Sequence, residues 1–451
     1  MPPNNQPSSF YGLGIAPKLL EALDKNKFTE PTPIQNQAIP VALQGEDVIG
    51  IAQTGTGKTL AFGVPMIQRL AAVKGRGLII LPTRELALQV DEMLQKIGRY
   101  VGLRTAVLIG GASMHRQKMD LAKKPHVIIA TPGRLIDHLE RKAVTLLGVS
   151  VLVLDEADRM LDMGFEPQIR RILQAVPQDR QTLLFSATMP AEIVNIANRY
   201  MKKPTRVEIA RSGTAAEKVT QEVYFLSRDE KPLLLEQLLK KYAGTVLVFT
   251  RTKHGASKLT RIVKRSNHAT AEIHSDRSLS QRRRALDGFK TGEFRVLVAT
   301  DIAARGIDVK DIELVVNYDL PDNADDYVHR IGRTGRAGKA GHAISFATPD
   351  QKSEVKAIER LIRGQIPVSV PKDLPRPTFK PAERFSPHAT PSYHASGPKR
   401  FDERRVQDKS KKRFQPKSRG YDYGKGRADD RRWNEPPKDM PKGGRTVRIH
   451  S

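Results

Sequence analysis

Short runs of apolar, largely β-branched residues alternate with amphipathic stretches from about residue 16 to 362. The expected strands are GLIIL, HVIIA, VLVLD, TLLFS, VLVFT, RVLVA, LVVNY and AISFA. The stretches between them, such as RELALQVDEMLQKIG and KPLLLEQLLKKY, repeat apolar residues at helical spacing. This alternation predicts an α/β fold in which helices cover both faces of parallel sheets.

A weak internal repeat divides the strands into two halves. Residues 78–87 (LIILPTRELA) resemble 246–256 (VLVFTRTKHGA), and 127–134 (VIIATPGR) resemble 296–305 (VLVATDIAAR). Each is a strand followed by a loop with Thr and Arg, and ligands of parallel sheets bind beyond the carboxyl ends of strands. We expect two similar lobes that face a shared ligand, although chance similarity between Val-rich strands would give the same repeat.

Length and composition also indicate several domains. The chain has 451 residues, more than the roughly 250 to 300 at which single cores stop growing. We predict an N-terminal extension at 1–15, lobes at 16–209 and 221–368, a polar linker at 210–220 and a tail at 369–451.

The tail has too few apolar residues for a core. Residues 371–451 hold 11 prolines but only four Ile, Leu or Val, so burial cannot offset the entropy of ordering, and we expect disorder. This segment has 22 Lys and Arg against 10 Asp and Glu, a net charge of +12.

The net charge of the chain indicates which kinds of molecule it could bind. The whole chain has 76 Lys and Arg against 49 Asp and Glu, and its net charge of +27 would attract nucleic acid or an anionic membrane surface. No stretch approaches the ~20 apolar residues of a membrane span, and the first residues lack signal-peptide features, which favours a soluble, cytoplasmic protein. The chain has no cysteine, which excludes disulfides and thiol nucleophiles.

A phosphate-binding loop is expected at residues 52–59, AQTGTGKT, between an apolar run and a helical pattern. In this context backbone N–H groups and a helix N-terminus hold phosphates. Ala52 stands where the strict pattern has Gly, so the match is to a looser form. Lys58 would reach the β- and γ-phosphates and Thr59 would ligate Mg²⁺. The other expected ATP-binding residues of the loop are Thr54, Gly55 and Gly57.

An acidic pair follows the buried strand of VLVLDEAD, residues 151–158. Asp155 could hold Mg²⁺, and Glu156 is placed to take a proton from an attacking water. Such pairs are more often helix caps or solvated turns. Together with a phosphate loop earlier in the chain, however, the pair favours NTP hydrolysis.

At this DEAD segment the chain resembles the DEAD-box RNA helicases, and the resemblance covers residues 10 to about 365. It implies two tandem RecA-like domains of the P-loop NTPase class, in helicase superfamily 2, with ATP and Mg²⁺ as cofactors. Phe28 and Gln35 in KFTEPTPIQ look like the family's Q motif, which implies a ring stacked on adenine and an amide paired to its edge. From the residues alone, this stretch could equally be a proline turn before a helix.

The resemblance implies phosphate contacts to RNA that read no bases. PTRELA (82–87), Gly110 with Gly111, and TPGR (131–134) match the family's first-domain RNA loops, and SAT (186–188) looks like its coupling motif. The implied RNA-binding residues are Pro82, Thr83, Arg84, Gly111, Thr131, Arg134, Arg251 and Thr300. The implied coupling residues are Ser186, Thr188, Asp158 and His329.

Three arginines, Arg330, Arg333 and Arg336, stand in VHRIGRTGRAGKAG (328–341) with no carboxylate among them. The part HRIGRTGR matches the family motif that faces ATP from the second domain, which implies that Arg333 and Arg336 act as arginine fingers. Asp308, in ARGID, matches a ribose contact. A basic RNA-binding loop would also permit this glycine spacing.

One segment departs from the family pattern. In HSDRSLSQRR, Ser275 and Leu279 stand where many relatives have Gly and Gln, whereas Arg282 fits. The change puts the local contacts in doubt, but not the fold. RMLDMGFEP and ATDIAARGID look most like the bacterial RhlE-type branch.

The resemblance implies an ATP-dependent RNA helicase that hydrolyses ATP in an RNA-stimulated manner and locally separates or remodels RNA. An ATP-gated RNA clamp or chaperone with little unwinding would carry the same motifs, and a DNA translocase is a third reading. The tail mixes basic and aromatic residues, as in KKRF and RRWNE, which suits either an RNA anchor or a solubilising extension. Ribonucleoprotein or RNA-degradation partners agree with this reading, but no motif names the RNA.

Overall fold

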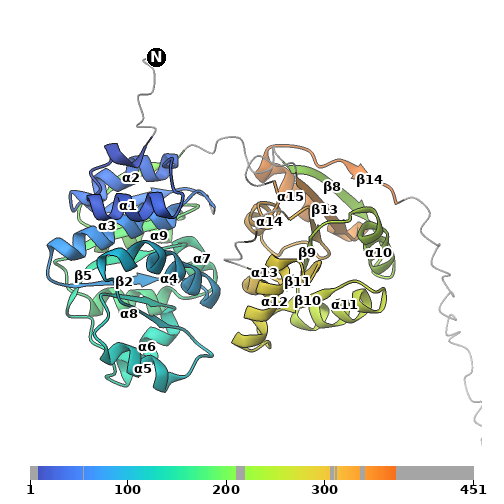
Figure 1. Cartoon of the computed structure of the whole chain (residues 1–451). Coiled ribbons are helices and arrows are strands. Elements are labelled where there is room, and N and C mark those ends of the chain that lie inside the picture. Colours follow the sequence, from blue (N-terminus) through green and yellow to red (C-terminus); the bar gives the residue numbers. More distant parts are fainter. Residues whose placement is uncertain are drawn as a thin grey trace, which may run out of the picture. The chain divides into compact units, whose positions relative to one another are not determined.

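The computed structural model describes residues 9–53, 55–209, 219–304, 309, 312–335 and 341–371. They form two α/β lobes, each built on one seven-stranded sheet with helices packed against it (Figure 1). The predicted tail beyond residue 371 and most of the predicted linker lie outside the described residues. So do three predicted site residues, Thr54, Asp308 and Arg336.

The sheet of the first lobe has the strand order β3-β4-β2-β5-β6-β1-β7, and every pair of neighbouring strands is parallel. All the loops that leave the carboxyl ends of these strands therefore emerge at one edge of the sheet. The strands are β1 (Val48–Ile51), β2 (Arg76–Ile80), β3 (Thr105–Leu108), β4 (Val127–Ala130), β5 (Val149–Leu154), β6 (Gln181–Ser186) and β7 (Thr205–Glu208).

Two cores lie on the two faces of this sheet because successive strand residues point to opposite sides. Ile79 of β2 belongs to one core, whereas Leu78 and Ile80 belong to the other. The first core is closed by α1 (Pro17–Lys25), α2 (Pro33–Leu43), α3 (Lys58–Ala72) and α4 (Arg84–Gly98). The second is closed by α6 (Pro132–Glu140), α7 (Ala157–Asp162), α8 (Glu166–Ala175) and α9 (Ala191–Tyr200), while α5 (Met114–Ala122) packs beside β3.

The sheet of the second lobe has the order β10-β11-β9-β12-β13-β8-β14 and is again parallel throughout. Its strands are β8 (Val219–Phe225), β9 (Val246–Thr250), β10 (Thr270–Ile273), β11 (Val296–Thr300), β12 (Leu314–Asn317), β13 (Gly341–Ala347) and β14 (Val368–Ser369). Its helices are α10 (Lys231–Lys241), α11 (Lys253–Arg265), α12 (Leu279–Thr291), α13 (Asp301–Ala304), α14 (Ala324–Ile331) and α15 (Lys352–Ile362).

The predicted fold class is confirmed, and each of the eight expected runs contains a strand. The folded part of each lobe begins at a different residue from the expected domain boundary. Phe10 and Leu13 are buried in the first core, so the structured part of that lobe begins inside the predicted extension. Strand β8 begins at Val219, inside the predicted linker. In the part of the chain that the structure describes, no helix combines the length and apolar character needed to cross a bilayer.

Candidate nucleotide and nucleic-acid sites

The Gly-rich loop connects β1 to α3 at the carboxyl edge of the first sheet. Gly57 has a φ of +88°, in the left-handed region that favours glycine, and a Cβ there would overlap Nε2 of Gln35. Helix α3 begins at Lys58, so the free N–H groups of its first turn are at the loop. This arrangement suits a phosphate.

Lys58 is buried under the loop. Its side chain is 6 % exposed, and Nζ donates a hydrogen bond to the carbonyl oxygen of Ala52 at 2.9 Å. Its positive charge also acts to lower the pKa of both Asp155 and Asp158. A buried ammonium group is stabilised by nearby negative charge, and the phosphates of a nucleotide would provide that charge at this loop.

The acidic pair stands where β5 ends. Burial raises the pKa of Asp155 to about 7, and the effect of the neighbouring Glu156 adds to that of burial while Lys58 opposes it. Glu156 is also buried and has φ +51° and ψ +49°, a left-handed conformation that is rare for a non-glycine residue. Among the residues that the structure describes, its Oε2 has no hydrogen-bond partner, and it lies 3.7 Å from Nε of Arg159. One oxygen of Glu156 thus remains available to a proton donor.

Gln35 ties the predicted adenine site to the phosphate loop. Its Nε2 donates to the carbonyl oxygen of Gly57 (2.9 Å), and its Oε1 accepts from the N–H of Thr32 (2.9 Å), which closes a capping box at the start of α2. Phe28 is half-buried and packs against the first core. The structure therefore gives Gln35 a positional role in the loop that the sequence did not reveal.

Asp158 joins the acidic segment to the loop after β6. Its Oδ2 accepts hydrogen bonds from the N–H groups of Ala187 (3.1 Å) and Thr188 (2.9 Å), and from the Thr188 hydroxyl (3.0 Å). Ser186 Oγ accepts from the N–H of Asp158 at 3.2 Å. Burial by itself raises the pKa of Asp158, but Lys58 and Arg159 bring it below its ordinary value, so this acceptor is ionised. Three of the four predicted coupling residues therefore meet in one network.

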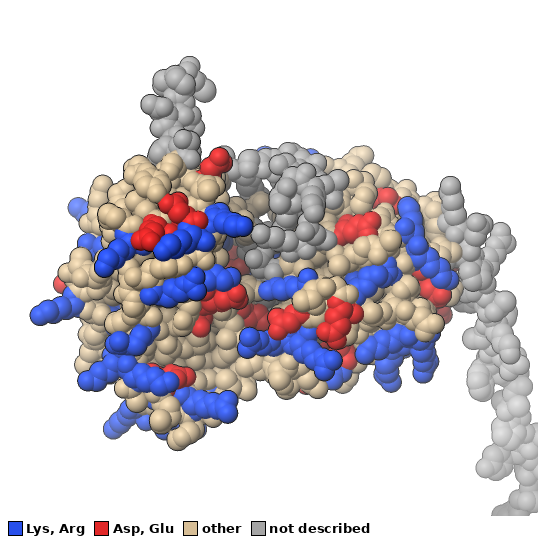
Figure 2. Space-filling view, in the orientation of Figure 1, with Lys and Arg blue, Asp and Glu red and all other residues tan. Residues whose placement is uncertain are grey.

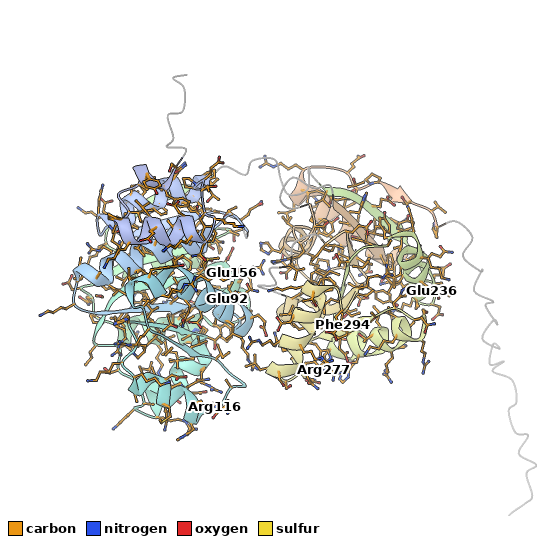
Figure 3. The ribbon with its side chains drawn as sticks, viewed as in Figure 1. Glu92, Arg116, Glu156, Glu236, Arg277 and Phe294 are labelled. Carbon is orange, nitrogen blue, oxygen red and sulfur yellow. The ribbon has the colours of Figure 1, made fainter. Side chains whose placement is uncertain are left out.

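Two groups of loops divide the carboxyl edge of the first sheet. The nucleotide candidates follow β1, β5 and β6, which are adjacent in the sheet. The predicted RNA loops follow β2, β4 and β3, which are adjacent on the other side of β5. Figure 3 shows the two parts well apart within the first lobe, with Glu156 in the first and Arg116, on α5, in the second.

The predicted RNA-binding residues of the first lobe stand at or close to helix starts. Thr83 and Thr131 are buried and precede α4 and α6 as N-cap residues. Arg84 passes close to Gly111, where a Cβ would overlap its guanidinium. Arg134 donates from Nη1 to the carbonyl oxygen of Ala112 (3.0 Å) and to Oε1 of Gln117 (3.2 Å). The set also includes Pro82, which lies in the loop after β2.

In the second lobe, Arg251 follows β9 and Thr300 ends β11, the adjacent strand. Arg251 is partly exposed and forms ion pairs with Asp322 (3.0 Å) and Glu354 (3.9 Å). Arg333, one of the two predicted arginine fingers, is 4 % exposed and donates from Nε to the carbonyl oxygen of His329 at 3.3 Å.

Arg330, the first arginine of the stretch, is enclosed within the second lobe. It is 2 % exposed, and its guanidinium donates to both carboxylate oxygens of Asp301 (2.5 and 2.6 Å) and to Oδ1 of Asn317 (3.1 Å). It also lies over the ring of Phe249, 5.0 Å from the centroid. The carboxylate missing from the stretch thus comes from α13, and Arg330 is an internal structural residue.

Comparison with known families decides the identity. The family model described as "DEAD/DEAH box helicase" matches residues 32–196, and the model described as "Helicase conserved C-terminal domain" matches residues 230–338. The chain belongs to the DEAD-box helicase family.

Relatives of this helicase agree with the assignment. It is 44% identical over 362 residues to the DEAD-box ATP-dependent RNA helicase CshA of Bacillus cereus, and the match covers 80% of this chain and 69% of that one. It is 41% identical over 363 residues to the ATP-dependent rRNA helicase RRP3 of Debaryomyces hansenii, with 80% and 76% covered. The RRP3 of Mycosarcoma maydis is 43% identical over 357 residues, and this helicase spans 64% of its length. Assignment to the RhlE-type branch stays a prediction.

Solved structures confirm the tandem RecA-like fold. The helicase matches S. cerevisiae Dbp5 bound to RNA and ADP BeF3 with a TM-score of 0.72 and 32% identity, covering 81% of this chain and 95% of that one. It matches Mss116p bound to ssRNA and AMP-PNP with a TM-score of 0.74 and 30% identity, covering 81% and 78%.

Proposed function

We propose that this helicase binds ATP and Mg²⁺ at the loops after β1, β5 and β6, and single-stranded RNA at the loops after β2, β3 and β4. The observation that carries the proposal is the shared carboxyl edge of one sheet, from which both groups of loops emerge. The likeness to two helicases solved with RNA and a nucleotide analogue supports it.

The residues at the nucleotide loop fit a magnesium ion. Mg²⁺ prefers oxygen ligands and is commonly shared between one or two protein oxygens and the phosphates of a substrate. Thr59 offers a hydroxyl in the first turn of α3, and the buried Asp155 offers a carboxylate whose pKa burial raises to about 7 although the charge of Lys58 opposes the shift. When bound, the metal would neutralise charge on the phosphates.

Hydrolysis requires a base and positive charge. Glu156 supplies the base, because its buried Oε2 has no hydrogen-bond partner in the described structure and can accept the proton of an attacking water. Lys58 supplies charge from the loop, and Arg333 and Arg336 would supply it from the second lobe as the γ-phosphoryl group transfers. Asp308 would contact the ribose, and Phe28 would stack on adenine.

RNA contacts are proposed to be sequence-independent. Arg84 and Arg134, with the helix N-termini after Thr83 and Thr131, are groups that grip phosphates and read no bases. On the face in Figure 2, basic and acidic side chains are interspersed on each lobe. Specific positions must therefore hold the strand, assisted by Arg251 and Thr300 and by the basic tail as an additional anchor. The coupling network, with His329 in the second lobe, would transmit hydrolysis to RNA release, and we place the protein in the cytoplasm.

Steady-state ATPase activity with and without single-stranded RNA, for the parent and Glu156→Gln, tests the proposal. We expect RNA to stimulate the parent strongly, and we expect Glu156→Gln to lose about 10²- to 10⁴-fold in kcat while it still binds ATP. Glu166→Gln is the matched control, because Glu166 is partly exposed and, within the described part of the chain, its one ion pair is with Arg170 on its own helix. Normal turnover by Glu156→Gln would disprove the general-base role.

A duplex assay separates the two outcomes for RNA. Release of a short strand on ATP addition supports a helicase that separates RNA. Stable retention on RNA without strand release would instead identify an ATP-gated clamp, and equal stimulation by single-stranded DNA would point to a DNA translocase.

A further inference from the structure

A buried network in the first lobe surrounds Gln117, a residue that the proposed function does not use. Gln117 stands on α5 and is 3 % exposed. Its amide contacts three groups: the carbonyl oxygen of Ile109 at the end of β3, the guanidinium of Arg134 and the imidazole of His138, both on α6. One side chain thus connects three of the elements that bear the proposed RNA loops.

The hydrogen bonds establish the orientation of the Gln117 amide, that is, which atom is Nε2 and which is Oε1. The carbonyl oxygen of Ile109 can only accept, so the amide atom 2.9 Å from it must be the donor Nε2. Oε1 then faces Nη1 of Arg134 at 3.2 Å and Nε2 of His138 at 2.9 Å, and both of these nitrogens must donate to it. His138 is fully buried and its Nδ1 has no hydrogen-bond partner among the described residues, so the ring is neutral with its proton on Nε2. Burial and the adjacent Arg134 lower the pKa of His138, which agrees with a neutral ring.

Arg134 is held by one end of its guanidinium. Nη1 is shared between the carbonyl oxygen of Ala112 and Oε1 of Gln117, and Nε lies 3.4 Å from the carboxylate of Asp137. Within the described residues, Nη2 has no hydrogen-bond partner. The Arg134 side chain is only 13 % exposed, so it cannot extend freely into solvent. Whether Nη2 contacts a phosphate therefore depends on the direction in which the guanidinium points.

We infer that Gln117 is a positioning residue for RNA binding: its amide holds the loop of Gly110 and Gly111 to Arg134 and sets the direction of the Arg134 guanidinium. The inference rests on the proposed role of Arg134 in binding RNA. A free arginine side chain loses much rotamer entropy when it binds a phosphate, whereas a side chain whose direction is already set has less to lose. A neutral amide suits the task, because a carboxylate at this position would neutralise Arg134 and weaken its attraction to RNA.

The test compares Gln117→Met with Gln68→Met in the full chain. Methionine has nearly the length and volume of glutamine but cannot accept the Arg134 hydrogen bond. Gln68 is the matched control, because its amide also bridges two backbone groups of the first lobe, accepting from Ala16 (2.8 Å) and donating to Gly14 (3.0 Å), remote from the RNA loops in the chain. We expect Gln117→Met to raise the RNA concentration for half-maximal ATPase stimulation about tenfold, with kcat at saturating RNA nearly unchanged. Gln68→Met should leave both values at the parent level.

A double-mutant cycle shows whether the effect passes through Arg134. In an Arg134→Met background, Gln117→Met should cause no further loss of RNA affinity. Additive losses, or equal losses in Gln117→Met and Gln68→Met, would overturn the inference and identify a general effect on stability. If Arg134→Met itself keeps full RNA affinity, the proposed role of Arg134 fails. If Arg134→Met loses affinity and Gln117→Met does not, only the positioning role fails.

Discussion

Asp158 and Thr188 are joined by two hydrogen bonds, since Oδ2 of Asp158 accepts from both the N–H (2.9 Å) and the hydroxyl (3.0 Å) of Thr188. The pair connects the segment that bears Asp155 and Glu156 to the loop after β6. In the proposed function, a change at the nucleotide site would reach that loop through this carboxylate.

Thr188→Val should uncouple turnover from strand separation. The substitution removes the hydrogen bond from the hydroxyl and keeps the one from the backbone N–H. We therefore expect ATPase activity within about threefold of the parent. The amount of duplex separated per ATP should fall roughly tenfold, which corresponds to the loss of one hydrogen bond to a charged group. Stopped-flow unwinding and ATPase measured on one preparation give the ratio. Thr205→Val is the control, because its hydroxyl bonds Glu46 at an exposed position. An unchanged ratio would show that the hydroxyl has no part in coupling.

Gly57→Ala should abolish nucleotide binding. The new Cβ would overlap Nε2 of Gln35 and would also strain the backbone, because φ is +88°. Gly102→Ala is the matched control: φ there is +71°, but nothing lies within 4 Å of the added Cβ. We expect both variants to lose about 1 kcal/mol of stability from the strain. Only Gly57→Ala should lose binding of a fluorescent ATP analogue, and retained binding would show that Gln35 can move aside.

Binding of Mg²⁺ and ATP should release a proton near neutral pH. Burial raises the pKa of Asp155 to about 7, and a metal ligand must be ionised, so affinity should fall by up to about tenfold per pH unit below 7 and level off above about 8. Calorimetry in buffers of different ionisation enthalpy measures the release, which Asp155→Asn should remove. Equal heats in all buffers would refute it.

The raised pKa of Asp155 also predicts how the stability of the nucleotide-free protein depends on pH. Because the folded pKa lies above the unfolded value of 3.8, the folded state binds the proton more tightly. The stability that Asp155 contributes is fully present below about pH 4 and is lost as the pH rises through about 7. In Asp155→Asn, this part of the pH dependence of unfolding should disappear.

Arg330→Met should destabilise the second lobe by about 3 kcal/mol, because it leaves Asp301 and Asn317 without their shared donor. Arg284→Met is the control, since the Arg284 side chain is 77% exposed and its ion pair with Glu293 is long, at 3.5 Å. Amide hydrogen exchange of β11 and α14 in the full chain reports the loss locally. Protection equal to that of the control would mean that the pair contributes little.

Local patterns predicted much of the fold and some of the site. VLVLD and VLVFT fall on strands because short runs of β-branched apolar residues favour an extended backbone that is buried on both faces. The helix expected from RELALQVDEMLQKIG is α4 with the same limits. The loop before α3 could also be selected from the sequence as a candidate phosphate site, since Gly55, Gly57 and Lys58 lie in one short segment. Gln35 was assigned to adenine alone, because its bond to the carbonyl of Gly57 crosses 22 residues and leaves no trace in the local pattern.

The amino-acid sequence by itself determined which segments are strands and helices and which loops carry Lys58, Asp155 and Glu156, because periodicity and turn residues act over a few positions. Only the tertiary structure decided which side chains meet. Gln117 reaches Arg134 across 17 residues and Arg330 reaches Asp301 across 29, and both pairs form because the order of strands in each parallel sheet brings distant loops to one edge. Strand order follows from burying whole faces of helices and sheets at once, and no short segment contains that information.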